Sequence, residues 1–170
     1  SWTPQWLNDT ATFSSIACFS PDTLIVNGSE QGQVIPSSHP ARYRSTDGGM
    51  TWNYVGQLPL SHPDPGYSFW APDIIRDKDG TYHLFVTYVP GDGDKHIGWD
   101  GNRYIFQYTS KDLWTWTFIQ KIPTASDRCI DPSLCQRPDG SWRMWYKDEG
   151  HRSETLALDS RDLKEWRSVK

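Results

Sequence analysis

Short strand-like runs, in which apolar and β-branched residues mix with polar ones, follow one another along the chain and are separated by turn-forming residues. Runs of this length, bounded by Gly, Pro, Asn, Asp or Ser, are typical of β-strands. No stretch longer than ten residues shows a helical period without Gly or Pro. The pattern predicts strands at 14–19, 23–26, 41–45, 51–56, 73–76, 81–88, 103–109, 115–120, 133–137, 141–147, 154–159 and 165–169.

Two short phrases recur three times each, in the same order. In the first, an Asp at a turn precedes a strand-like run, and Asp-Gly in two of the copies is a strong hairpin signal. In the second, Ser is followed two residues later by Asp and then by Trp. The turn aspartates are Asp22, Asp79 and Asp139, and the second phrase begins at Ser45, Ser110 and Ser160. The repetition predicts three copies of one unit.

Four antiparallel strands in each unit are typical of a β-propeller blade. We therefore expect an all-β protein with one domain over 1–170 and blades at about 11–58, 69–122 and 129–170. A plain β-sandwich would not explain why the two phrases repeat in order. Because propellers close with four to eight blades, we expect either a piece of a longer polypeptide or copies that associate to close a five- or six-bladed ring.

Composition narrows the choice of partners. The net charge is −4 and there is no Lys/Arg cluster, so nucleic acid is not an expected partner. The mean hydropathy of −0.70, with no long apolar run, argues against a membrane span. Three Cys form no disulfide framework and no Cys/His set, so we expect no metal and no cofactor. The sequence does not determine the cellular compartment of the protein, although a secreted or periplasmic location is favoured if the substrate is a polysaccharide. Ten Trp indicate a rigid β core or a surface that stacks on flat ligands.

Strand direction predicts which residues share one end of the blades. Neighbouring strands alternate in direction, so the start of a first strand and the end of a second strand lie together. Candidate catalytic carboxylates at this end are Asp73, Asp131 and Glu149. Candidate substrate-binding residues are Trp70, Tyr88, His96, Trp99 and His151, of which His96 and Trp99 lie in an insertion of the second unit. The Ser-x-Asp turns fall at the opposite end and are interpreted as structural.

Paired carboxylates can act on an acetal, one as acid and the other as base or nucleophile, while Trp faces stack on sugar rings. Simpler interpretations stand beside this one. Asp73 and Asp131 could be strand caps or turn residues, and Glu149 could be a solvated loop carboxylate. His96 and His151 taken alone are weak indications.

Over about 40–170 the chain resembles glycoside hydrolase family 43 and the related invertase-like families. The resemblance rests on Trp70-Ala71-Pro72-Asp73-Ile74, on Ile130-Asp131-Pro132-Ser133-Leu134, and on the Ser-x-Asp-Leu-x-x-Trp segments beginning at 110 and 160. It implies a five-bladed propeller glycosidase. In that family the Asp at the position of Asp131 tunes the general acid and orients the substrate, and the segment of Trp70 and Asp73 lines the pocket.

The chain also departs from the family's pattern. Ser14 stands where the family has its general base, and the general acid belongs to a blade beyond the third, so Glu149 is a candidate on geometry alone. The segment from Ser45 to Trp52 resembles the Asp-box of sialidases, a structural motif. Arg42, Arg44 and Arg103 lie on predicted third strands, where they would not form the arginine cluster of a sialidase.

The sequence thus predicts a glycosidase that cleaves a polysaccharide or oligosaccharide. Two alternatives remain: a lectin-like propeller that binds carbohydrate without cleaving it, and an inactive truncated fragment. The absence of the expected base at Ser14 favours the lectin-like alternative.

Overall fold

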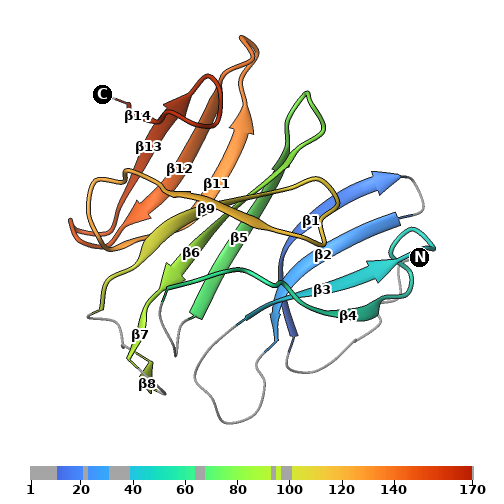
Figure 1. Ribbon diagram of the computed structural model, residues 1–170. Coiled ribbons are helices and arrows are strands. Elements are labelled where there is room, and N and C mark those ends of the chain that lie inside the picture. The colour runs from blue at the N-terminus through green and yellow to red at the C-terminus, as the bar shows by residue number, and fades with distance from the viewer. Residues whose placement is uncertain are drawn as a thin grey trace.

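The computed structural model describes residues 11–20, 23–30, 39–63, 68–92, 95–96 and 101–169 (Figure 1). Within these residues every regular element is a β-strand. None of the described residues belongs to a helix long and apolar enough to cross a membrane.

The strands form three four-stranded antiparallel sheets, each equivalent to one predicted unit. Blade 1 has the order β1-β2-β3-β4, blade 2 the order β10-β9-β6-β5, and blade 3 the order β11-β12-β13-β14. Blade 1 contains β1 (Ala11–Ser20), β2 (Thr23–Glu30), β3 (His39–Ser45) and β4 (Asn53–Gln57). Blade 2 contains β5 (Ser68–Arg76), β6 (Tyr82–Val89), β9 (Tyr104–Ser110) and β10 (Thr117–Lys121). Blade 3 contains β11 (Cys129–Gln136), β12 (Trp142–Asp148), β13 (Glu154–Ser160) and β14 (Arg167–Ser168).

The first strands of the three blades lie at the centre of the fan that the sheets form in Figure 1. β5 lies next to both β1 and β11, so the first strands are the innermost ones. This arrangement confirms the all-β fold of propeller blades. The first strands begin three to five residues earlier than predicted. A bulge lies near the start of each one, and because a bulge interrupts the alternation of side chains, the residues before it did not look like part of a strand. In blade 3 the fourth strand is shorter than predicted, with only Arg167–Ser168 paired.

Aromatic and aliphatic side chains between blades 2 and 3 form one continuous core. Phe85 and Ile105 of blade 2 are fully buried against residues of blade 3 that include Met144 and Leu158. Trp166, the last residue of the third repeated phrase, packs edge-to-face on Phe85, with ring centroids 5.6 Å apart. The repeated Trp therefore joins its own blade to the preceding one.

The Ser-x-Asp turns of blades 2 and 3 have the same hydrogen bonds, and in the turn of blade 1 the Ser and Asp side chains bond to each other and to nearby backbone amides in a related way. In blade 2, Ser110 Oγ donates to Asp112 Oδ1 at 3.0 Å and accepts the Leu113 amide at 2.8 Å. Asp112 Oδ1 then accepts two further backbone N–H groups. In blade 1, hydrogen bonds from Ser45 and Thr51 lower the pKa of Asp47 to about 2. These contacts support the structural role that the sequence predicts for these aspartates.

A buried polar chain also joins blades 2 and 3. The Gln107 amide donates to His83 Nδ1 at 3.1 Å and to the Leu163 carbonyl at 2.9 Å. Because Nδ1 accepts, the other ring nitrogen of His83 carries the proton that it shares with Asp77, 3.0 Å away. Gln120 completes the chain by donating to the Gln107 carbonyl oxygen. The packing of the two blades is thus fixed by directional contacts as well as by apolar burial.

Candidate active site

The start of each innermost strand pairs with the end of the second strand of the same blade, as the predicted strand directions require. Trp70 pairs with Thr87 in blade 2, and Ile130 pairs with Lys147 in blade 3. We call the end of the blades that contains these four residues the funnel end. The end that contains the hairpin turns and the Ser-x-Asp turns is called the turn end.

A β-bulge interrupts each innermost strand near the funnel end. The pairing skips Ala71 and Pro72 in β5, and Asp131 and Pro132 in β11. Ala71 and Asp131 both have a positive φ, 44° and 56°, which is uncommon for residues other than glycine. β1 shifts its register at Ser14. At the bulges, the skipped residues do not follow the regular alternation of side chains between the two faces of the sheet. Of these three bulges, only the one in blade 3 contains a carboxylate.

The Asp131 backbone is held by the neighbouring blade. Its amide donates to Thr87 Oγ1 at 3.0 Å, and Thr87 is fully buried on β6. Asp131 is exposed overall, but partial desolvation of its carboxyl group raises the pKa of that group. The positive charge of Lys147 lowers this pKa, and the negative charge of Glu149 raises it further. Asp131 is therefore a carboxyl group with an altered pKa at the funnel end.

Asp73 is not the counterpart of Asp131, contrary to the expectation that both open an innermost strand in the same way. The residue equivalent to Asp131 is Ala71, and Asp73 corresponds to Ser133, since each follows the bulge. Asp73 Oδ2 accepts the Leu134 amide of blade 3 at 2.8 Å. Burial raises the pKa of Asp73 despite this hydrogen bond. Its carboxylate links two blades.

Glu149 neutralises a buried arginine. Glu149 Oε2 lies 3.2 Å from Arg103 Nη1, and the Arg103 side chain has no exposed surface. The other oxygen of Glu149 lies 3.1 Å from Lys147 Nζ. Arg103 immediately precedes β9, and its backbone pairs with Arg128 before β11. Glu149 is thus part of a contact between blades 2 and 3 as well as a neighbour of Asp131.

His151 is oriented by a buried carboxylate. Its Nδ1 lies 3.0 Å from Asp148 Oδ2, the imidazole is 68% exposed, and the Asp148 side chain is completely buried. Asp148 Oδ1 accepts from Ser126 Oγ at 2.6 Å and from the Gly150 amide at 2.8 Å. Burial acts to raise the pKa of Asp148, but the hydrogen bonds from Ser126, His151 and Gly150 outweigh it and lower the pKa.

The remaining predicted residues have different surroundings. Trp70 is half-buried beside the bulge of β5. Tyr88 has only 1% of its surface exposed, and its ring stacks on Phe106 with centroids 4.4 Å apart, so it lies in the core of blade 2 instead of lining a pocket. His96 ends β8 (Lys95–His96), which pairs with β7 (Gly91–Asp92) in the insertion, and its side chain lies outside the described part. Trp99 also lies outside the described residues.

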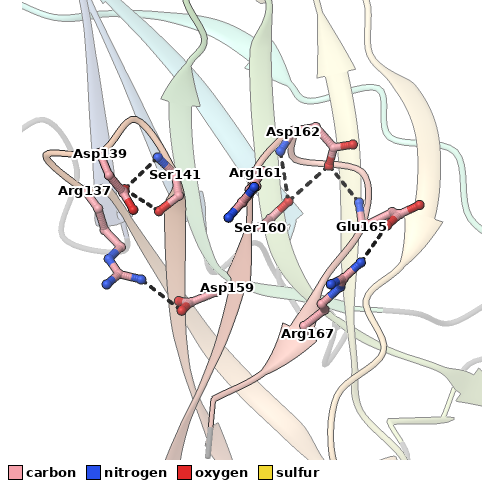
Figure 2. A pocket seen from close by; sticks show the side chains of 9 residues that line it. All are labelled: Arg137, Asp139, Ser141, Asp159, Ser160, Arg161, Asp162, Glu165 and Arg167. Atoms are coloured by element: carbon pink, nitrogen blue, oxygen red, sulfur yellow. Dashed lines mark hydrogen bonds and ion pairs between the residues drawn. The ribbon is translucent and has the colours of Figure 1, made fainter.

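Two cavities lie at the turn end, away from Asp131. The first, of about 550 Å³, is shown in Figure 2 and is lined mainly by charged residues of blade 3. Several of these groups already neutralise one another: Arg137 pairs with Asp159, and Arg167 lies 3.5 Å from Glu165. Asp159 also pairs with Arg143, which does not line the cavity. A second cavity of about 960 Å³ lies between blades 2 and 3 at the same end. We place the candidate active site at the funnel end because that end has the carboxyl of altered pKa on a strained backbone.

Sequence reasoning missed Thr87 and Arg103. Nothing in the local pattern distinguishes Thr87 from other β-branched strand residues. Arg103 was predicted on a third strand, where it would not join a sialidase-type arginine cluster, but it immediately precedes β9 at the funnel end. The burial of Arg103, which makes a carboxylate partner necessary, could not be inferred from the sequence.

The three four-stranded sheets, with their first strands innermost, are blades of a β-propeller. No protein-family model and no curated protein matches the sequence. Solved structures do match, and glycosidases with a propeller fold are among them.

The α-L-arabinanase of Penicillium chrysogenum, solved with arabinobiose, is 19% identical, with a TM-score of 0.63 over 92% of this chain and 47% of that one. The GH43_1 enzyme of Xanthomonas citri, solved with xylotriose, is 15% identical, with a TM-score of 0.64 over 94% and 55%. Fructan 1-exohydrolase IIa of Cichorium intybus is 14% identical, with a TM-score of 0.68 over 97% and 33%.

At this identity the likeness establishes the fold. It confirms, at the level of fold, the resemblance to the family 43 and invertase-like propellers that the sequence motifs carry. The chain spans between a third and just over half of the length of these proteins.

Proposed function

We propose that this chain is part of a glycoside hydrolase that cleaves a polysaccharide or oligosaccharide at the funnel end of its blades. The observation that carries the proposal is the position of Asp131, on a positive-φ bulge held by a neighbouring blade, where partial desolvation raises the pKa of its carboxyl group. Perturbed carboxyl groups on strained backbone are typical of catalytic sites. The glycosidase neighbours support the substrate class.

In this proposal Asp131 orients the sugar and adjusts the protonation of the group that donates a proton to the leaving oxygen. Trp70, at the start of the same funnel, provides an aromatic face for a sugar ring. Lys147 and Glu149 set the electrostatic field around Asp131. Arg103 keeps Glu149 in place through the ion pair between blades.

Hydrolysis of a panel of aryl arabinosides, xylosides, fructosides and galactosides tests the proposal. Asp131→Asn should lower kcat/KM on the preferred substrate about a hundredfold, a typical contribution of acid–base catalysis. The variant should be at least as stable as the wild type, because the partial desolvation that raises the pKa of Asp131 disfavours the ionised carboxyl that the substitution removes. Asp127→Asn, which alters an exposed ion pair with Lys121, is the matched control and should keep full activity. Full activity of Asp131→Asn would overturn the proposal.

A lectin-like propeller that binds carbohydrate without turnover is the second candidate. It is favoured by the bulges of blades 1 and 2, which contain Ser14 and Ala71 where blade 3 has Asp131. Glycosidases generally need two carboxyl groups at one site. This function predicts that sugars quench tryptophan fluorescence, that Trp70→Ala removes the quenching, and that no product forms over days.

Further blades would complete the funnel, supplied by a longer polypeptide or by a second copy of the chain. Trp145 of blade 3 occupies the position that Phe85 occupies in blade 2, because each pairs with the residue that follows the bulge. Phe85 is fully buried by blade 3, whereas Trp145 is 39% exposed. Light scattering after gel filtration separates the two sources: an oligomer indicates copies, and a 19.6 kDa monomer indicates a longer polypeptide. A Trp145→Glu variant that assembles and acts like the wild type would contradict this expectation.

A further inference from the structure

The backbone conformation of Asp131 is unfavourable for an aspartate that is followed by a proline. Asp131 precedes Pro132, and the ring of a proline restricts the backbone of the residue before it. Its φ of 56° lies in the left-handed region, where a Cβ atom is crowded by the following carbonyl. Such a conformation persists only where surrounding groups determine it. The bulge also removes the Asp131 amide from the regular ladder, so the amide needs an acceptor from elsewhere.

That acceptor comes from another blade. Thr87 Oγ1 accepts the Asp131 amide at 3.0 Å, across the contact between blade 2 and blade 3. Thr87 has no exposed surface, and it is paired on both sides within blade 2, with Trp70 and with Ile105. A β-branched side chain on a doubly paired strand has few rotamers available, so the position of its hydroxyl is well defined.

The equivalent position in blade 3 gives an internal comparison. Lys147 pairs with Ile130 just as Thr87 pairs with Trp70. Lys147 contacts Glu149 and lowers the pKa of Asp131 by its charge. Asp131 is therefore set between Thr87, which fixes its backbone, and Lys147, which acts on its carboxylate.

We propose that Thr87 is a positioning residue: its hydroxyl, delivered from the neighbouring blade, fixes the left-handed backbone of Asp131 and thereby the direction of the Asp131 carboxylate. The proposal rests on the proposed function only for its catalytic consequence. The structural consequence can be measured whether or not the chain hydrolyses a glycoside.

The test compares Thr87→Val, Thr87→Ser and Thr109→Val. Valine keeps the shape of threonine but has no acceptor, and serine keeps the acceptor. Thr109 is the matched control, because it lies on the adjacent strand β9, in register with His83, and makes no hydrogen bond to Asp131. Two readouts do not depend on activity: hydrogen exchange of the Asp131 amide, and the carboxyl titration of Asp131 followed by ¹³C NMR and assigned with Asp131→Asn.

Thr87→Val should accelerate exchange of the Asp131 amide at least about tenfold, since the hydrogen bond that protects it is lost. It should also move the carboxyl titration toward the usual value for aspartate, because a released carboxyl gains water. Thr87→Ser and Thr109→Val should leave both readouts unchanged. If Thr87→Val does not fold, Thr87→Ala against Thr87→Ser makes the same comparison, since only serine keeps the acceptor.

In a chain that hydrolyses a substrate, Thr87→Val should lower kcat about ten- to a hundredfold with little change in KM, and Thr87→Ser should restore it. Wild-type exchange and titration of Asp131 in a folded variant that lacks the hydroxyl would overturn the positioning role. Altered exchange and titration in a protein without hydrolytic activity would support the positioning role and count against the proposed function.

Discussion

Removing the carboxylate of Glu149 should destabilise the protein strongly, because it would take away a counter-charge that lies against the buried Arg103. The Arg103 side chain is completely buried, Glu149 is only 13% exposed, and their charged atoms lie 3.2 Å apart. Breaking one partner of a buried ion pair typically costs about 3–5 kcal/mol. Since Glu149→Gln removes the charge but keeps the size of the side chain and a polar oxygen beside Arg103, we expect a loss at the lower end of this range, about 3 kcal/mol.

Urea denaturation measures this loss. With an m value of about 2 kcal/mol/M, the unfolding midpoint should fall by about 1.5 M at unchanged m. Asp127→Asn is the control, since the Lys121–Asp127 pair is closer, at 2.7 Å, but is 45% and 60% exposed. An exposed pair contributes about 0–1 kcal/mol, so this control should shift the midpoint little.

A double variant isolates the cause. Arg103→Met combined with Glu149→Gln removes both charges, and replacing a buried pair by uncharged groups is often nearly neutral. The double variant should therefore be more stable than Glu149→Gln alone. Equal midpoints for Glu149→Gln and Asp127→Asn would refute the reasoning, and Glu149 would then have to be viewed as a free loop carboxylate.

Three further outcomes follow from the contacts. The pKa of Asp47 is about 2 in the folded state, below its usual 3.8, so the stability contributed by its turn is complete above about pH 4 and is lost as the pH falls toward 2. Asp47→Asn should flatten this part of a curve of unfolding free energy against pH; an unchanged slope would contradict the assignment. Asp73→Ala should cost about 1–3 kcal/mol in urea, because the Leu134 amide loses its acceptor, and Asp73→Asn should cost less. Equal losses for the two variants would show that the hydrogen bond is unimportant. Gly150→Ala would place a Cβ atom 2.6 Å from Ser126 Oγ, so it should cost about 1–3 kcal/mol in the free energy of unfolding and lower the thermal midpoint. A midpoint at or above that of the wild type would contradict the close approach.

The repeat could be predicted because its chemistry is local. Ser110, Asp112 and the following amides bond within six residues, so the turn can be recognised from adjacent letters, and the same holds at Ser160. These turns, with the one at Ser45, and the matching hairpin signals were enough to predict three units of four antiparallel strands. The direction of the strands then placed Asp131 and Glu149 at one end.

The bulges could not be predicted. Asp73 and Asp131 looked equivalent because each is next to a proline near the start of a strand, but the proline precedes Asp73 and follows Asp131. Only the pairing shows that Ala71 has the conformation of Asp131. When two residues of a strand are left out of the pairing, the alternation of polar and apolar positions in the sequence does not reveal it.

The burial of side chains by neighbouring blades could not be predicted from the sequence either. Every residue of β6 is buried, since blade 2 is covered on both faces, so Tyr88 enters the core although it lies near the funnel end. Contacts between blades also decide the surroundings of Thr87 and Arg103. Such contacts depend on how sheets pack, which a strand-by-strand pattern does not encode.

The central claim is that carbohydrate is recognised at the funnel end and not in the cavities of the turn end. A crystal structure of the chain soaked with arabinobiose or xylotriose tests it most directly. The account predicts a sugar within hydrogen-bonding distance of the Asp131 carboxylate, with a ring against Trp70. A sugar bound among Arg137, Asp159 and Arg161, with the funnel end empty, would contradict it.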